Sequence, residues 1–145
     1  VNEEVFSYAY KSGVETVLNP APANKPTDIL LEHTSWFIPN EVEFEEIYGE
    51  VFNEDNLLLF ANDLKTNVVV TLGEKGCAYI KNNSVKIMNT DSVKAIDTTG
   101  AGDAFVGAFS FGVASKLEIE ECLKLALQKA TDSVTKKGTQ SSYKN

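Results

Sequence analysis

Two aspartates bracket a run of small residues in this chain, at Asp97-Thr98-Thr99-Gly100-Ala101-Gly102-Asp103. The small and apolar residues that follow, at 104–109, predict a tightly packed helix that begins at the glycines. The first amides of a helix have no partner within it, and the helix dipole adds partial positive charge there. Glycine lets a ligand approach such a backbone closely. The stretch therefore predicts an anion site with an ionisable Asp103 at its rim, an arrangement suited to deprotonating a hydroxyl beside a phosphoryl group.

The spacing of small residues alone also fits a simpler interpretation. In that interpretation a strand-to-helix turn uses the glycines for its bend, and Asp103 only favours the helix N-terminus. The loop Thr71-Leu72-Gly73-Glu74-Lys75-Gly76 has a similar ambiguity, because it matches neither a Walker A motif nor Gly-x-Gly-x-x-Gly. Taken alone, that loop is an ordinary tight turn. Acidic residues after Asn40 likewise fit a capped helix start with a solvated acidic face.

The elements that must position these residues alternate between strands and helices. Strands are expected at 16–19, 35–38, 67–71 and 93–96, with a β-hairpin formed by 77–80 and 85–88. Helices are expected up to Gly13, over 28–33, between Asn40 and Gly49, from Asn53, and over 118–135. The pattern predicts an α/β fold with a mostly parallel sheet flanked by helices.

Several polar residues come directly after the expected strands. Valines at 68–70 are typical of a parallel strand that is covered on both faces. Ligands of such sheets bind beyond the carboxyl ends of the strands. We therefore expect one edge of the sheet to gather Asn19, Asn40, Thr71 and Asp97.

Composition bounds the class of protein. The 145 residues are 43% hydrophobic and 23% charged, which fits one soluble domain. A net charge of −8 argues against a nucleic-acid surface, although backbone amides and a metal can still hold a nucleotide. Cys77 and Cys122 have no metal-ligand spacing and are expected as reduced, buried thiols of a cytoplasmic protein. No apolar run is long enough to span a membrane, and the amino terminus is not typical of a signal peptide.

The whole stretch Asp-Thr-Thr-Gly-Ala-Gly-Asp-Ala-Phe-Val-Gly-Ala-Phe resembles the carboxyl-terminal signature of the ribokinase (PfkB) family of sugar and nucleoside kinases. The resemblance implies a Rossmann-like ribokinase fold in which Asp103 is the catalytic base and contacts the substrate. It also implies that the backbone of Gly100, Ala101 and Gly102 forms an anion hole for the transferred phosphate.

The same resemblance implies a cofactor for each further motif. The loop after residue 70 is similar to the family's ATP-binding loop, and Asn-x-x-Glu at 40–43 is similar to its motif for Mg²⁺ and phosphate. The implied ATP-binding residues are Asn40, Thr71, Leu72, Gly73, Glu74, Lys75, Gly76, Gly102 and Leu127. Glu43 is implied in Mg²⁺ binding, partly through water. The implied K⁺ site comprises Asp97, Thr99, Ser133, Lys136, Gly138 and Ser142, several of them through backbone carbonyls.

Two stretches, Asn-Pro-Ala-Pro-Ala at 19–23 and Gly-Thr-Gln-Ser-Ser-Tyr at 138–143, resemble ribokinases in particular. They imply ATP-dependent phosphorylation of D-ribose to ribose 5-phosphate by a full-length homodimer. Alternatives are another kinase of the family, such as a fructokinase or adenosine kinase, a truncated nucleotide-binding module without catalysis, or an α/β interaction domain.

The resemblance covers only the carboxyl-terminal half of the family's length, and the chain begins at Val1. We expect residues 1–145 to be the nucleotide-binding and catalytic part of a longer fold, without its amino-terminal sugar-binding and lid part. Alone, this part is expected to be inactive.

Overall fold

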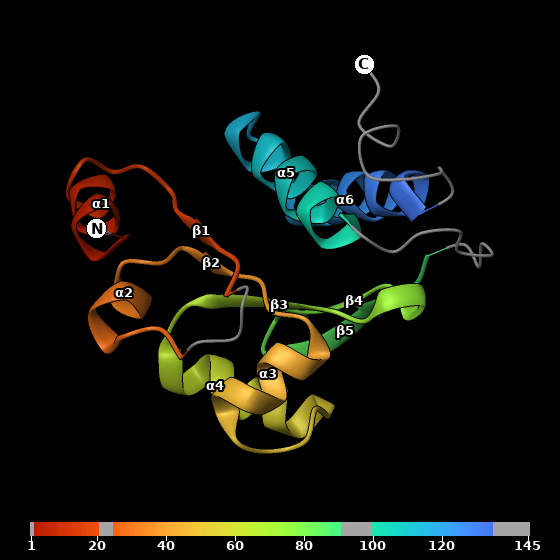
Figure 1. Ribbon diagram of the computed structural model, residues 1–145, viewed down its shortest axis with the longest axis horizontal. Helices are drawn as coiled ribbons and strands as arrows, with labels where there is room; N and C mark the ends of the chain where they lie inside the picture. The colour runs from red at the N-terminus through yellow and green to blue at the C-terminus, as the bar shows by residue number, and fades with distance from the viewer. Residues whose placement is uncertain (1, 21–24, 91–99, 135–145) are drawn as a thin grey trace. The chain divides into compact units, whose positions relative to one another are not determined.

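The computed structural model describes residues 2–20, 25–90 and 100–134 (Figure 1). These residues form two compact units. Of the described residues, the first unit contains 2–20, 25–72 and 78–87, and the second contains 73–77, 88–90 and 100–134. Among the described residues, none of the helices is both long and apolar enough to cross a membrane.

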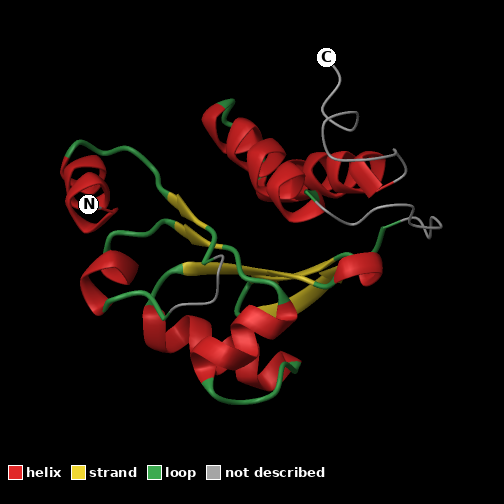
Figure 2. Ribbon diagram, in the orientation of Figure 1, coloured by secondary structure: helices red, strands yellow, loops and turns green. Residues whose placement is uncertain are grey.

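Five strands form one sheet in the order β1-β2-β3-β4-β5 (Figures 1 and 2). Their bounds are β1 Val17–Leu18, β2 Trp36–Phe37, β3 Asn67–Thr71, β4 Cys77–Lys81 and β5 Ser84–Met88. The first three strands are parallel, with Val17 beside Trp36 and Phe37 beside Val68. β4 follows β3 after only five residues, and a parallel pair would need a longer crossover. The sheet is therefore mixed.

The helices of the first unit are α1 Asn2–Lys11, α2 Asp28–Glu32, α3 Glu41–Tyr48 and α4 Glu54–Leu64. The helices α3 and α4 cover one face of the sheet (Figure 2). Helix α1 ends as the sequence predicts. Gly13 has a φ of 71°, its N–H reaches the carbonyl of Tyr10 at 3.1 Å, and the N–H of Val14 reaches that of Ala9 at 2.9 Å. These two bonds form a Schellman motif, which satisfies carbonyls at the end of the helix.

The hairpin of β4 and β5 turns at Asn82 and Asn83. Both asparagines have positive φ, 53° and 58°, as a two-residue hairpin turn of type I′ requires. Asparagine tolerates this left-handed backbone better than most side chains do. The predicted hairpin is therefore confirmed.

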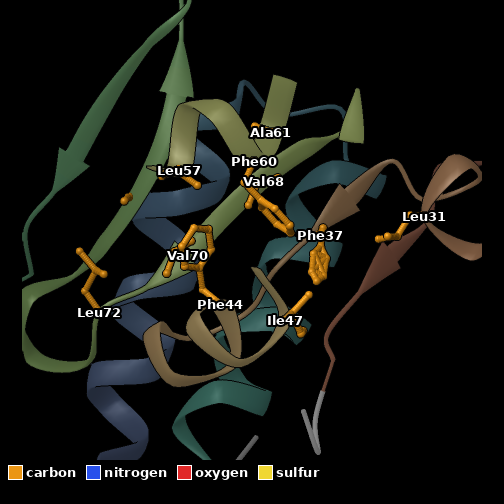
Figure 3. Close-up of a cluster of buried hydrophobic side chains, with 11 residues drawn as sticks. Leu31, Phe37, Phe44, Ile47, Leu57, Phe60, Ala61, Val68, Val70 and Leu72 are labelled. Atoms are coloured by element: carbon orange, nitrogen blue, oxygen red, sulfur yellow. The ribbon is translucent and has the colours of Figure 1, made fainter. Parts of the chain in front are cut away.

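The core of the first unit lies between the sheet and the helices α3 and α4 (Figure 3). Phe44 is fully buried, and its ring packs edge-on against Phe60, with the ring centroids 5.2 Å apart. Val68, Val69 and Val70 on β3 are at most 3% exposed. Since successive side chains of a strand point to opposite faces, both faces of β3 are covered, as the sequence predicts.

The second unit contains the short helix η1 Gly73–Lys75 and the long helices α5 Ala101–Ala114 and α6 Ile119–Val134. Helices α5 and α6 approach closely at Gly112. A Cβ at this position would lie 2.8 Å from the Sγ of Cys122 and 3.2 Å from its Cα. Glycine is therefore required for the packing of the two helices.

The predicted α/β class is confirmed by these elements. Cys77 and Cys122 are buried thiols that form no disulfide, as expected. The strand predicted at 93–96 lies outside the described residues.

Candidate active site

The N-terminus of α5 begins at Gly100, the residue on which the predicted anion site depends. Gly100 is the N-cap and has a φ of 88°, a left-handed backbone that glycine adopts without steric cost. The first i→i−4 bond of the helix joins the N–H of Ala104 to the carbonyl of Gly100, at 2.9 Å. The amides of Ala101, Gly102 and Asp103 therefore precede the hydrogen-bonded ladder and have no acceptor within the helix.

Asp103 is the third residue of this helix and is exposed. A carboxylate in the first turn interacts favourably with the helix dipole. Gly102 is also exposed, and a Cβ added to it would meet no atom within 4 Å. Open amides and an exposed carboxylate thus share one helix turn, where an anion and a proton donor can both approach. Asp97 and Thr99, which were predicted to flank this turn, lie outside the described residues.

The first unit brings two predicted nucleotide residues together. Asn40 and Thr71 form an isolated parallel bridge, and the N–H of Thr71 donates to the carbonyl of Pro39 at 3.0 Å. Asn19 directly follows β1, the neighbouring parallel strand. Three of the four segments predicted to converge therefore lie at the carboxyl ends of β1, β2 and β3.

The loop that continues from Thr71 is closed by glycine geometry. Gly73 has a φ of 60° and Gly76 a φ of 100°, and the N–H of Gly76 donates to the carbonyl of Gly73 at 3.2 Å. A Cβ on Gly76 would lie only 1.9 Å from the carbonyl oxygen of Met88. Leu72 is buried, whereas Glu74 and Lys75 are exposed. The exposed crest of the loop is therefore accessible to a ligand.

Asn40 and Glu43 form a capping box at the start of α3. The Oδ1 of Asn40 accepts from the N–H of Glu43 at 2.8 Å, and the Oε2 of Glu43 accepts from the N–H of Asn40 at 2.8 Å. The simpler interpretation, a capped helix start, therefore applies to this pair as well. A carboxylate has a second oxygen with acceptor capacity of its own.

The donor set limits how Mg²⁺ could be held. Within the described part of the chain, no three His, Cys, Asp or Glu side chains gather into a metal-binding group. Mg²⁺ commonly keeps several waters and uses one or two carboxylates together with substrate phosphates. One half-buried carboxylate at Glu43 fits this water-mediated binding, and the ion itself would neutralise phosphate charge.

Leu127 and Ser133 both lie on α6. Leu127 is 7% exposed, and Ser133 is 2% exposed with its Oγ donating to the carbonyl of Ala130 at 2.8 Å. The hydroxyl of Ser133 is thus engaged within its own helix. The other residues predicted for K⁺, Asp97, Thr99, Lys136, Gly138 and Ser142, lie outside the described residues.

Two supporting residues of the site were missed by the sequence interpretation. Pro39 supplies the carbonyl that binds Thr71, and Met88 supplies the carbonyl against which Gly76 packs. Both contacts join residues that are distant in sequence and act through the backbone. No local pattern of side chains could have indicated them.

Burial changes the chemistry of the cysteine that follows the loop. Desolvation raises the pKa of Cys77 to about 12, from an ordinary value of 9.0. The thiol is therefore neutral at physiological pH and is not a nucleophile, because the reactive form is the thiolate.

Comparison with known proteins agrees with the sequence resemblance. The profile of the pfkB family of carbohydrate kinases matches residues 1–145. Deoxyribokinase of Salmonella typhi is 38% identical over 144 residues, covering 95% of this chain and 47% of the relative. Ribokinase of Mus musculus is 39% identical over 151 residues, covering 97% of this chain and 46% of the relative.

A solved structure matches a similar share of this chain. The structure of Arabidopsis thaliana ribokinase complexed with ribose and ATP is 28% identical, with a TM-score of 0.86. The match covers 97% of this chain and 48% of that structure. The chain thus spans about half the length of the curated relatives it matches.

Proposed function

Because the chain belongs to the pfkB family of carbohydrate kinases, we propose that it is the nucleotide-binding and catalytic part of an ATP-dependent sugar kinase. In this proposal residues 1–145 correspond to the carboxyl-terminal half of the enzyme, and the sugar-binding and lid part is the half that they do not match. The observation that carries the proposal is the first turn of α5, where exposed Asp103 shares one turn with amides that have no helical acceptor.

Asp103 accepts the proton of the primary hydroxyl of the sugar as that oxygen attacks the terminal phosphoryl group of ATP. The bond from this phosphorus to the bridging oxygen breaks, and ADP leaves. Backbone amides of Gly100, Ala101 and Gly102 stabilise the negative charge on the phosphoryl oxygens. Such preorganised donors matter because phosphoryl transfer depends on positioning and electrostatic stabilisation. The open space beside Gly102 leaves room for the phosphate.

The nucleotide is bound by the loop 71–76 together with Asn40, and Leu127 borders the adenine. Glu43 would hold Mg²⁺, partly through water, with the carboxylate oxygen that the capping box does not use. When bound, Mg²⁺ would neutralise part of the charge on the phosphates. The proposed K⁺ residues are Asp97, Thr99, Ser133, Lys136, Gly138 and Ser142. They would hold the ion beside the anion hole, where it would fix the loop without contacting the phosphate. Replacing K⁺ by a cation that does not bind should therefore lower kcat.

D-Ribose is the proposed acceptor. Support comes from the Arabidopsis thaliana ribokinase structure, which is a complex with ribose and ATP, and from the Mus musculus ribokinase. The Salmonella typhi deoxyribokinase is nearly as similar to this chain. A panel of ribose, deoxyribose, fructose and adenosine therefore tests the acceptor, and preferred turnover of any sugar other than ribose would contradict this part of the proposal.

A chimera supplies the half of the fold that this chain does not match. In it, residues 1–145 replace the matching part of Mus musculus ribokinase. Asp103→Asn should lower kcat by about 10²- to 10⁴-fold, because asparagine cannot accept the proton, while the Kd for ATP stays nearly unchanged. Asp63→Asn removes an exposed carboxylate from α4 and serves as the matched control. Turnover by the Asp103→Asn chimera equal to that of the control would exclude Asp103 as the base.

A nucleotide-binding module without catalysis is the second candidate, because the chain matches only about half of its relatives. This candidate predicts that the chimera binds ATP with a measurable Kd but gives no sugar-dependent ADP. A chimera that binds no adenine nucleotide at all would contradict both candidates and favour an interaction domain.

A further inference from the structure

A hydrogen bond between two side chains ties the end of the hairpin to helix α6 in the second unit. The Oγ1 of Thr90, two residues beyond β5, lies 2.9 Å from the Oγ1 of Thr131 on α6, and both residues are half-buried. Threonine is a less favourable helix residue than alanine, and its hydroxyl can bond a carbonyl of its own helix. The hydroxyl of Ser133 does so, with the carbonyl of Ala130, whereas Thr131 reaches a residue 41 positions away in the sequence. The bond of Thr131 therefore joins two segments rather than stabilising its own helix.

The Thr90 side of this bond continues into the proposed nucleotide loop. Met88 and Asn89 immediately precede Thr90, and their backbone atoms are those that Gly76 packs against. A Cβ on Gly76 would lie 1.9 Å from the carbonyl oxygen of Met88 and 3.0 Å from the Cα of Asn89. Residues 88–90 therefore contact the loop at one end and α6 at the other. All three segments belong to the second unit.

The Thr131 side of the bond leads to Leu127. Leu127 precedes Thr131 by four residues on α6, and residues four apart lie on the same face of a helix, one turn from each other. Leu127 is 7% exposed and is the residue proposed to border the adenine. The bond to Thr90 therefore fixes the face of α6 that carries Leu127 relative to the segment that supports the loop.

We propose that Thr90 and Thr131 are positioning residues for the nucleotide, whose hydrogen bond holds Leu127 and the loop 73–76 at the spacing that ATP requires. Neither hydroxyl needs to contact the nucleotide. Without the bond, the loop and the helix are less ordered before ATP arrives, and binding must then also order them, which weakens affinity. Once ATP is bound, the ligand itself joins the two parts. Loss of the bond should therefore weaken ATP binding and leave the chemical step nearly unchanged.

This inference rests on the proposed assignment of the loop and Leu127 to ATP, and it does not depend on Asp103 as the base. Thr131→Val tests it, because valine keeps the branched shape of threonine and has no hydroxyl. Thr131→Ser keeps the hydroxyl and should restore the bond. Ser110→Ala is the matched control, because it removes a half-buried hydroxyl from α5.

Isothermal titration calorimetry of the 145-residue chain with ATP and Mg²⁺ measures the effect. The Kd for ATP should be about 3- to 10-fold higher in Thr131→Val, the range expected for the loss of one hydrogen bond. In Thr131→Ser and in Ser110→Ala, the Kd should stay within about 2-fold of that of the unchanged chain. A Kd in Thr131→Val equal to that of Ser110→Ala would overturn the proposal.

A double-mutant cycle shows whether the effect belongs to this pair of hydroxyls. Thr90→Val should raise the Kd by a factor similar to that of Thr131→Val. The two substitutions together should raise the Kd no further than either one alone, because the second removes no remaining bond between the two residues. Factors that multiply would show that the two residues act independently, and this result would contradict the proposal.

The kinetics of the chimera with the unmatched half of Mus musculus ribokinase distinguish positioning from a general loss of stability. In Thr131→Val, the KM for ATP should rise about 3- to 10-fold, while kcat and the KM for the sugar stay within about 2-fold of the unchanged chimera. A destabilised fold would instead reduce the active fraction, and so lower the apparent kcat without a selective change in the KM for ATP. That pattern would exclude a positioning role.

Failure of the proposed function would give a different result. If neither the unchanged chain nor the unchanged chimera binds ATP, the assignment of the loop to the nucleotide is wrong, and the positioning role is overturned with it. If they bind ATP and Thr131→Val binds it equally well, only the positioning role is overturned. Should either the chain or the chimera be insoluble, the Kd for ATP measured with the other decides.

Discussion

Gly76 is the position where a single added methyl group should have the largest effect on the proposed nucleotide loop. Its φ is +100°, and a Cβ would lie 1.9 Å from the carbonyl oxygen of Met88, 2.9 Å from its carbonyl carbon and 3.0 Å from the Cα of Asn89. All three atoms belong to the backbone. Rotation of a side chain therefore cannot relieve the clash, and a chain segment must move by about 1 Å or more to restore an ordinary contact distance.

The free-energy cost of Gly76→Ala has two parts. A left-handed backbone costs a residue other than glycine about 1–2 kcal/mol. Overpacking of a closely packed contact adds typically about 1–3 kcal/mol. The free energy of unfolding should therefore fall by about 2–5 kcal/mol. Gly73→Ala is the matched control, because Gly73 also has positive φ, +60°, but a Cβ there would meet no atom within 4 Å.

Urea unfolding followed by circular dichroism gives the two free energies. Hydrogen exchange of residues 73–77 and 88–90 should accompany it, because two compact units need not unfold in one step. The exchange of these segments should accelerate in Gly76→Ala and change little in Gly73→Ala. A Gly76→Ala protein as stable as Gly73→Ala would show that the contact with Met88 does not constrain the loop.

Three further perturbations test packing, ionisation and the capping box. Gly112→Ala should destabilise the protein by about 1–3 kcal/mol relative to Gly107→Ala in urea unfolding. A Cβ at Gly112 would lie 2.8 Å from the Sγ of Cys122, whereas a Cβ at Gly107 would meet no atom within 4 Å. Equal stabilities of the two variants would contradict the close approach of α5 and α6. Burial raises the pKa of Cys77 to about 12. On raising the pH, the unfolded state therefore loses its thiol proton before the folded state does. The free energy of unfolding should fall as pH rises from about 9 towards 12, by about 2 kcal/mol at pH ~10.5. A Cys77→Ala protein that loses as much stability over this interval would refute that assignment. Glu43→Gln keeps an acceptor for the capping box and should change the free energy of unfolding by less than about 1 kcal/mol. The same variant should weaken the Mg²⁺ dependence of ATP affinity, measured by isothermal titration calorimetry. An unchanged dependence would exclude Glu43 from the Mg²⁺ role.

Those parts of the fold that depend on neighbouring residues were predictable from the sequence. Gly49 ends α3 with a φ of 88°, and the side chain of Asn53 accepts from the N–H of Asn56 to cap α4, as expected. The strand expected at 67–71 is β3 with the same bounds. These features follow from steric freedom and local hydrogen bonds, which act within a few residues.

Contacts through the backbone between distant segments were not predictable. The Thr71 amide binds the carbonyl of Pro39, and Gly76 packs against the carbonyl of Met88. Every residue carries a carbonyl, so the identity of the accepting residue leaves no signal. The positive φ of Gly76 could be predicted from the sequence, whereas its contact with the last residue of β5 could not.

The pair Asn40 and Glu43 shows that a structural role and a proposed catalytic role can share the same side chains. The pattern Asn-x-x-Glu has the spacing of a capping box, and the structure confirms the box. One oxygen of Glu43 is held 2.8 Å from the N–H of Asn40, and Asn40 is bridged to Thr71 at the carboxyl ends of β2 and β3. A carboxylate fixed in this way loses little further rotamer freedom when it binds a hydrated ion. In the proposed site, the cap would therefore preorganise the carboxylate for Mg²⁺, so that finding the cap does not count against the metal role.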